Sequence, residues 1–306
     1  MNVFAVSGLV NAIISIVFGV LVIFENSRDQ KNRTFFLLTL ALAVWAGAYW
    51  RWMLATDYAT ALFWVRALSV ASLFIPVFFF HWALLLIDAD EFFINKVLVY
   101  GAYLVAIGTI YFVNTSYFIT DLSQRSYFEF WPDSGVLYDV YFSYLYIGLI
   151  TYSAYLLIKA FFVEPDKNKK GQILYVIFGG LFGFGGGLTN FPLWWGIDIP
   201  PYGNFLVAVF PFFLGYSILR YKLFNIRTMA TEFMVFALLV FMFITTILST
   251  NLTQMLMNGV FLAISAVVGI TLIRIAHTLE RTTEELSESN TRQENLIHFI
   301  SHEVKG

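Results

Sequence analysis

The sequence predicts an all-α fold, that of a polytopic helical membrane protein. Only 12% of its 306 residues are charged and 59% are hydrophobic, whereas a soluble domain carries about 25% charged residues. The mean hydropathy is +0.74, and the hydrophobic residues gather in runs of about 20, the length that a helix needs to cross a bilayer. We therefore expect about nine transmembrane helices, a seven-helix bundle plus a two-helix unit, followed by a cytoplasmic coiled-coil signalling helix.

Nine apolar runs, each closed by a polar or turn-rich break, predict these helices. The first run has neither a basic leader nor an A-x-A-like cleavage site, so we expect a retained helix rather than a cleaved signal peptide. The third run is long and contains Pro76, which predicts a kink. The seventh run is short for a spanning helix. The runs are 3–24, 34–54, 61–87, 97–113, 140–162, 172–195, 205–219, 233–250 and 259–276.

The connections between these runs divide the chain into four parts. A basic, partly amphipathic stretch separates the first seven runs from the last two, and a polar stretch follows the ninth. We expect a seven-helix transmembrane domain over 1–219, a cytoplasmic linker over 220–232, a two-helix transmembrane unit over 233–276 and a coiled-coil helix over 277–306.

Lysine and arginine collect in the loops on one side of the predicted membrane. Arg28, Lys31 and Arg33 follow the first run, and a second basic loop spans 163–171. The loops that alternate with these contain Arg125 as their only clear basic residue. Because cytoplasmic loops are enriched in basic residues, we expect a multi-pass protein of the inner (cytoplasmic) membrane with its N-terminus outside and its C-terminus in the cytoplasm.

Charge and cysteine content exclude several kinds of site. The net charge is −2 and the charges lie in short clusters, which does not indicate a nucleic-acid partner. The chain has no cysteine, so it has neither disulfides nor thiolate metal sites. The stretch GGLFGFGGG lacks the Lys-Ser/Thr of a P-loop. Instead, Gly179, Gly183 and Gly187 repeat every four residues and predict a face on which membrane helices pack closely.

An apolar seam continues beyond the last transmembrane run. Its residues follow one another in steps of three and four, the a/d pattern of a coiled coil, which predicts a parallel homodimer. Three of them, Thr282, Ser289 and Gln293, are polar and weaken the preference for one packing register, as a switch requires. The alternative is a solvated helix of marginal stability. The seam consists of Leu272, Ile275, Leu279, Thr282, Leu286, Ser289, Gln293, Leu296 and Ile300.

A histidine follows the end of this seam. His302 lies two residues after Ile300, about 200° around the helix, and therefore faces away from the seam. Glu303 is placed to accept a hydrogen bond from the imidazole and so to fix its tautomer. His298 lies four residues earlier, but the H-E-x-x-H pattern and a third ligand are missing, so we expect no metal site.

The stretch FISHEVKG, which contains this histidine, closely resembles the H-box of sensor histidine kinases. The stretch PPYGNFLVAVFPFFLGYSILRYKLFNIR resembles, more loosely, the end of the seven-helix N-terminal input region of some of these kinases. The resemblance implies that 1–219 is a sensory domain and that 277–306 includes a truncated phosphoacceptor helix. It further implies that His302 is the phosphoacceptor, Glu303 its activating neighbour and Phe299 a core anchor.

The resemblance also implies partners and cofactors. We expect a homodimer, a cognate response regulator, the lipid bilayer and an unidentified external or membrane-borne ligand. No cofactor is expected in this chain, because ATP and Mg²⁺ belong to the ATP-binding domain of the full-length kinase. We expect that domain beyond Gly306, so the chain alone should be inactive. The alternative function is a solute transporter or channel with a cytoplasmic regulatory tail, although transporter-like repeats and midplane charges are not evident.

Two arginines near the outer ends of adjacent helices suggest a ligand pocket. Arg51 and Arg66 lie beside tryptophans, with Asp57 in the loop between them. An arginine there either faces the bundle interior or snorkels to the interface. Two interpretations therefore remain: the arginines form a cationic pocket wall, or they anchor the helices at the interface. We expect the outer loop 114–139 to form a lid or to dock on the bilayer. The residues that would complete the pocket are Asn190, Trp194, Trp195 and Tyr202.

Overall fold

The computed structural model describes residues 3–219, 231, 234–235, 238–239, 242–243, 245–246, 249 and 251–303. Beyond Leu279, side chains are described only at 282, 283, 286 and 293. The internal contacts fall into two compact units, Met1–Leu223 and Phe224–Gly306.

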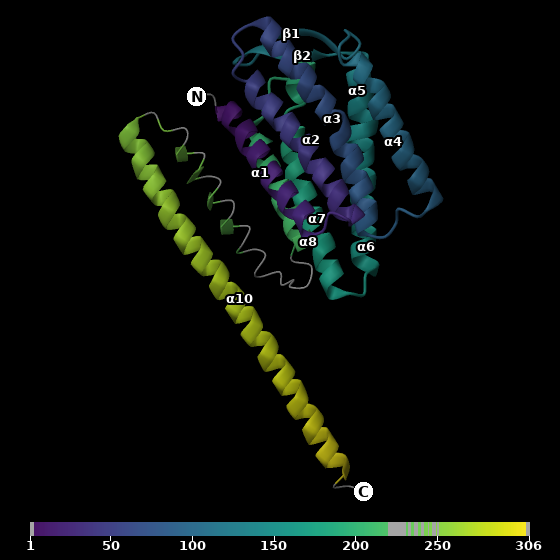
Figure 1. Ribbon diagram of the computed structural model, residues 1–306, viewed down its shortest axis with the longest axis vertical. Coiled ribbons are helices and arrows are strands. Elements are labelled where there is room, and N and C mark those ends of the chain that lie inside the picture. The colour runs from purple at the N-terminus through teal and green to yellow at the C-terminus, as the bar shows by residue number, and fades with distance from the viewer. Residues whose placement is uncertain are drawn as a thin grey trace. The chain divides into compact units, whose positions relative to one another are not determined.

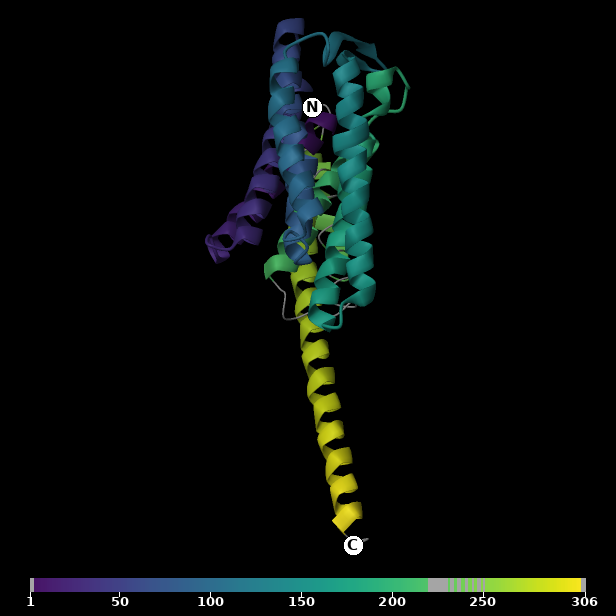
Figure 2. The same cartoon turned by 90° about the vertical axis from the view of Figure 1, so that its right-hand side faces the viewer.

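The first unit is a bundle in which successive membrane-length stretches run in opposite directions (Figures 1 and 2). Six of its stretches are long and apolar enough to cross a membrane, and Tyr202–Ile218 is a shorter apolar one. This outcome confirms the prediction of a polytopic helical membrane protein. The helices are α1 (Val3–Glu25), α2 (Gln30–Trp52), α3 (Tyr58–Leu86), α4 (Phe93–Phe112), α5 (Val136–Val140), the π-helix η1 (Tyr141–Gly148), α6 (Leu149–Val163), α7 (Lys167–Leu188), the 3₁₀-helices η2 (Pro192–Trp195) and η3 (Tyr202–Ala208), and α8 (Val209–Leu219).

Aspartate side chains set where three of the helices begin. Asp29, Asp57 and Asp166 are the N-caps of α2, α3 and α7, and each carboxylate accepts a hydrogen bond from a backbone N–H of the first turn. Such caps satisfy amide groups that have no partner within the helix. Because these caps start each helix soon after the preceding one ends, the turns before α2, α3 and α7 are short.

The segment 114–139 contains a β-hairpin, so the fold is not purely helical. Strand β1 (Ile119–Arg125) pairs antiparallel with β2 (Phe128–Ser134). Aromatic residues favour strands, and Phe128 and Trp131 are buried. This hairpin lies where α2 ends, and we call that end of the bundle the hairpin end (Figure 1).

Pro76 interrupts the hydrogen-bond ladder of α3. Proline has no N–H, so the carbonyl of Ser72, four residues earlier, loses its usual helical donor. The hydroxyl of Tyr141 in η1 donates to this carbonyl at 3.1 Å. A partly buried backbone carbonyl is thereby satisfied by a side chain of another helix, as the apolar interior of a membrane requires.

The glycines of α7 pack against α8, as predicted. A Cβ at Gly179 would meet Leu214 and Phe213, and one at Gly183 would clash with Phe210. The missing side chains let the two backbones approach closely. Gly187 lies instead beside the Tyr146 hydroxyl.

A buried polar network holds the 3₁₀ segment η3 in place. Asn204 is fully buried, and its Nδ2 donates to Ser7 Oγ of α1 at 2.7 Å. Its backbone carbonyl accepts from Asn11 Nδ2 at 2.9 Å, and its Oδ1 accepts from Asn190 Nδ2 at 3.0 Å. Irregular backbone is tolerated at membrane depth where it is buried in protein. This network holds η3 in such a buried position by hydrogen bonds to its neighbours.

Ion pairs join helices at the opposite end of the bundle, which we call the Asp88 end. Asp88 follows α3 with a positive φ of 53° and bonds Lys31 at 3.2 Å and Lys169 at 2.6 Å. Burial raises the pKa of Asp88, but the hydrogen bonds from Lys169 and Lys31 outweigh it, and the pKa lies below its usual range. Asp88, in the loop after α3, thus pairs with one lysine from each of the two basic loops.

The second unit contains α10 (Leu252–Glu303), a single helix of 52 residues. Its part Leu252–Leu279 is the seventh stretch that is long and apolar enough to span a membrane. The predicted run 259–276 lies inside it. The run 233–250 and the linker 220–232 fall mostly outside the described residues, so nine spans and the coiled coil stay predictions.

The α7–α8 contact generates a first prediction. Replacing Gly183 with Val should lower the unfolding free energy by about 1–3 kcal/mol, because the added methyl groups overlap Phe210. Thermal unfolding of the purified protein in detergent measures this loss. Gly185→Val is the control, since a Cβ at Gly185 meets no atom within 4 Å. Equal loss of stability in both variants would show that helix propensity, not packing, is responsible.

The contact at Pro76 generates a second prediction. Tyr141→Phe should cost about 1–3 kcal/mol of stability, because the Ser72 carbonyl loses its donor. Tyr144→Phe in the same π-helix is the control, since Tyr144 is 73% exposed and should tolerate the change. Thermal unfolding under the same conditions compares the two, and a Tyr141→Phe variant as stable as the parent would contradict the assigned role.

Candidate functional site

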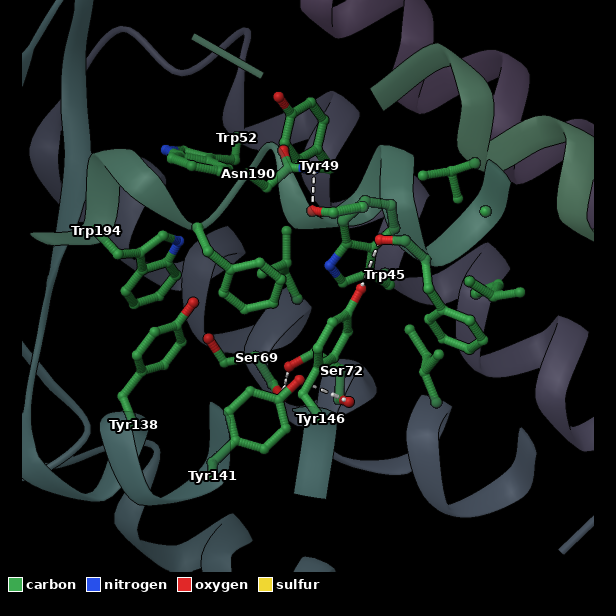
Figure 3. A pocket seen from close by; sticks show the side chains of 18 of the residues that line it. Trp45, Tyr49, Trp52, Ser69, Ser72, Tyr138, Tyr141, Tyr146, Asn190 and Trp194 are labelled. Atoms are coloured by element: carbon green, nitrogen blue, oxygen red, sulfur yellow. Dashed lines mark hydrogen bonds between the residues drawn. The ribbon is translucent and has the colours of Figure 1, made fainter. Parts of the chain in front are cut away.

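A cavity of about 70 Å³ lies inside the first unit, beneath the hairpin. Residues from α2, α3, η1, α7, η3 and the hairpin line it, and most of them are aromatic. Figure 3 shows the rings and hydroxyl groups gathered around this space. Cavities between the helices of a bundle are common binding sites for small molecules.

The π-helix η1 places tyrosines at one wall. Its hydrogen bonds close over five residues instead of four, which brings side chains five apart onto one face. Tyr141 and Tyr146 have this spacing, and both line the cavity. Tyr138, just before η1, stacks on Trp194 with ring centroids 3.9 Å apart and an interplanar angle of 8°.

The hairpin closes the cavity at the hairpin end. Trp131 of β2 lines the cavity and lies against Trp52, with ring centroids 4.7 Å apart. Trp52 Nε1 donates to the Phe130 carbonyl at 2.7 Å. The strands are braced by the ion pair between Arg125 and Asp133 at 2.6 Å. The segment 114–139 thus forms one wall of the cavity, while its predicted role as a lid or as a contact with the bilayer stays a prediction.

Two further contacts fasten the hairpin from neighbouring segments. The Tyr58 hydroxyl bonds Asp121 at 2.7 Å, and this contact lowers the pKa of the Asp121 carboxyl. The hydroxyls of Tyr127 and Tyr202 lie 2.6 Å apart, and their hydrogen bond raises the pKa of Tyr127. All four groups are exposed, so the contacts can exchange with water.

Two of the residues predicted for a pocket line this cavity. Asn190 is buried, and its Nδ2 donates to the carbonyl of Gly187 and to Oδ1 of Asn204. Trp194 forms part of the aromatic wall. Trp195 and Tyr202 lie outside it: Trp195 Nε1 bonds Asp139 at 2.7 Å, and Tyr202 contacts the hairpin.

The two arginines do not line this cavity. Arg51 is exposed and lies over the rings of Trp50 and Trp64, 5.8 and 5.6 Å from their centroids. Arg66 donates to the Asn114 carbonyl at 3.3 Å and lines a separate cleft. Asp57 caps α3, and the hydrogen bond from the Thr60 backbone lowers the pKa of its carboxyl. The residues predicted to form one pocket therefore lie in separate places. A ligand role for Arg51, Arg66 and Asp57 stays a prediction.

Sequence reasoning missed the remaining aromatic lining, above all Tyr49, Trp131 and Tyr141. These residues come from three distant segments, and only the packing of α2, the hairpin and η1 brings them together. Tyrosine and tryptophan residues within the apolar runs could have indicated a buried site, because their polar groups usually need a partner there. This pattern does not show which runs are neighbours in the fold.

The predicted phosphoacceptor lies in the other unit. His302 and Glu303 occupy the end of α10, and their side chains are outside the described part of the chain. Their roles therefore stay predictions. Among the residues with described positions, no group of three or more histidine, aspartate or glutamate side chains is arranged to hold a metal ion.

Comparison with known families identifies the bundle. The family model described as the N-terminal 7TM region of histidine kinase matches residues 8–227. No curated protein matches the chain, and no solved structure matches it. The matched region includes all the bundle helices from most of α1 to the end of α8. The chain therefore belongs to the family of histidine kinases that have an N-terminal seven-transmembrane region.

Proposed function

We propose that this chain is the sensing and signal-transmitting part of a two-component sensor histidine kinase, phosphorylated on His302 when an ATP-binding domain is present. The observation that carries the proposal is the continuity of α10. This helix runs without a break from its apolar part, Leu252–Leu279, to Glu303, and so links a membrane span directly to the stretch that resembles the H-box. Membership of the kinase family favours this function over the transporter that composition alone allows.

The bundle contains a direct route from the cavity to the exit of the sensory domain. Val207 and Phe210 line the cavity, and Phe210 also packs against Gly183 of α7. Both residues lie in the segment formed by η3 and α8, whose end at Leu219 leads into the basic linker. A change in the cavity would therefore displace the last helix of the bundle. We propose that the linker and the two-helix unit pass this displacement to α10.

The chemistry at His302 follows from the properties of imidazole. A neutral imidazole nitrogen attacks the γ-phosphate of ATP, and ADP leaves as a phosphohistidine forms. Glu303 would accept a hydrogen bond from the other ring nitrogen and hold the reactive tautomer. ATP and Mg²⁺ would be held by the ATP-binding domain, the phosphoryl group would pass to a response regulator, and the active species would be a homodimer in the inner membrane.

The proposed orientation is tested by labelling single cysteines, because the chain has none of its own. Gln124 in the hairpin and Asn168 at the start of α7 are both exposed and lie at opposite ends of the bundle. With the N-terminus outside, an impermeant thiol reagent should modify Gln124→Cys in intact cells and leave Asn168→Cys unmodified. Permeabilised cells should show modification of both. The reverse pattern in intact cells would overturn the orientation.

The role of His302 is tested in a complete kinase that contains this chain and an ATP-binding domain. Acid-labile phosphate should form in the parent and in His298→Gln, and it should be lost in His302→Gln. The rate should fall as pH drops below about 6.5, the ordinary pKa of histidine, because protonation removes the nucleophilic lone pair. Label that persists in His302→Gln would show that another residue is the phosphoacceptor.

A further inference from the structure

We propose that the cavity beneath the hairpin binds a small neutral molecule that has an apolar body and a hydroxyl group, and that this class of molecule is the stimulus. Its signalling consequence rests on the proposed kinase function, whereas the binding itself does not. Three properties of the described residues lead to this class: the absence of charge in the lining, the set of unpaired polar atoms, and the size of the space.

The lining selects against ions. Among the described residues, the cavity is lined by Leu, Ile, Val, Phe, Trp, Tyr, Ser, Gly and Asn, and by no acidic or basic residue. An ion that leaves water for such a site loses its hydration and gains no countercharge. Aromatic rings attract cations weakly by comparison. A neutral ligand avoids this cost.

Three residues that line the cavity carry unpaired polar atoms, and these atoms define what such a ligand must offer. Tyr49, Trp131 and Asn190 are 1%, 0% and 7% exposed, and within the described part of the chain the Tyr49 hydroxyl, Trp131 Nε1 and Asn190 Oδ1 have no hydrogen-bond partner. Buried polar groups are nearly always paired, so each unpaired one calls for an explanation. A ligand at this position would supply the missing partners.

The donor and acceptor roles of these atoms are fixed by their surroundings. Trp131 Nε1 can only donate. Asn190 Nδ2 faces two acceptors, the Gly187 carbonyl and Oδ1 of Asn204, so the amide orientation is set and Oδ1 is left to accept. The Tyr49 hydroxyl can do either. A ligand hydroxyl both donates and accepts, and it can therefore satisfy an acceptor and a donor together.

The size of the cavity limits the apolar body. A volume of about 70 Å³ is roughly half that of an engineered cavity that binds benzene, about 150 Å³. The conformation described here thus suits a body of a few carbon atoms. A larger ligand would require the hairpin to move, and the exposed contacts of Tyr58 and Tyr127 are where it would detach.

The test uses trifluoroethanol, a neutral alcohol of suitable size, and follows its ¹⁹F NMR signal with the chain in lipid nanodiscs. We expect saturable line broadening beyond that in empty nanodiscs. Trifluoroacetate, an anion of similar size, should show none. Tetramethylammonium should not compete with the alcohol. Saturable broadening of the trifluoroacetate signal, displacement of the alcohol by tetramethylammonium, or no saturable binding of the alcohol would overturn the proposal.

Substitution at Tyr49 separates the cavity from other binding positions. Tyr49→Phe keeps the ring and removes the unpaired hydroxyl, so affinity for trifluoroethanol should fall about three- to tenfold, while thermal stability should not decrease. Tyr144→Phe, at an exposed tyrosine, should leave affinity unchanged. Equal affinity in both variants would place the alcohol elsewhere and refute the site. Because these measurements use no ATP, failure of binding is distinguishable from failure of the kinase assignment, which only the His302 variants test.

Discussion

The hydrogen bond from the Tyr141 hydroxyl to the Ser72 carbonyl is the interaction on which the interior of the bundle depends. The hydrocarbon interior of a bilayer offers no water to a backbone group that loses its partner, and at Pro76 another element supplies the donor. That donor comes from η1, and the hydrogen bond fixes where η1 lies against α3. Tyr138 and Tyr146 are then directed at the same space as Tyr141, and the three tyrosines form one wall of the cavity.

The same constraint explains how η3 is held. Its backbone is 3₁₀ rather than α-helical, and Asn204 connects it to α1 through Ser7 and Asn11. Asn190 belongs to this network through its Nδ2 and to the cavity through its Oδ1. One amide therefore couples the position of η3 to the cavity, while the glycines of α7 keep α8 in close contact.

Seven of the nine predicted runs fall on described stretches that are long and apolar enough to span a membrane, because a spanning helix is defined mainly by the length of its apolar run. The first run was expected at 3–24 and α1 spans Val3–Glu25. The hairpin was missed, since its strands are stabilised by burial of Phe128 and Trp131 against distant helices. Asn190 and Trp194 line the cavity and Arg51 and Arg66 do not, since an arginine in an apolar run does not reveal which way it faces. The ligand role predicted for all four residues stays a prediction. His302 was proposed from a local motif, which needs no knowledge of neighbours.

The pairing of Asp88 with two lysines makes the two ends of the bundle respond differently to ionic strength. The Asp88 side chain is 64% exposed, and its ion pairs weaken as salt shortens the Debye length from about 10 Å at 0.1 M to about 3 Å at 1 M. The aromatic contacts of the hairpin end carry no net charge and are insensitive to screening. A cleft at the Asp88 end includes Asp88, Lys169 and Ile218 near the end of α8. The hairpin also holds an ion pair, Arg125–Asp133, but its side chains are only 35% and 22% exposed. Added salt would therefore weaken the ion pairs around the end of α8 before those of the hairpin. The rigidity of α8 where it leaves the bundle would thus depend on ionic strength.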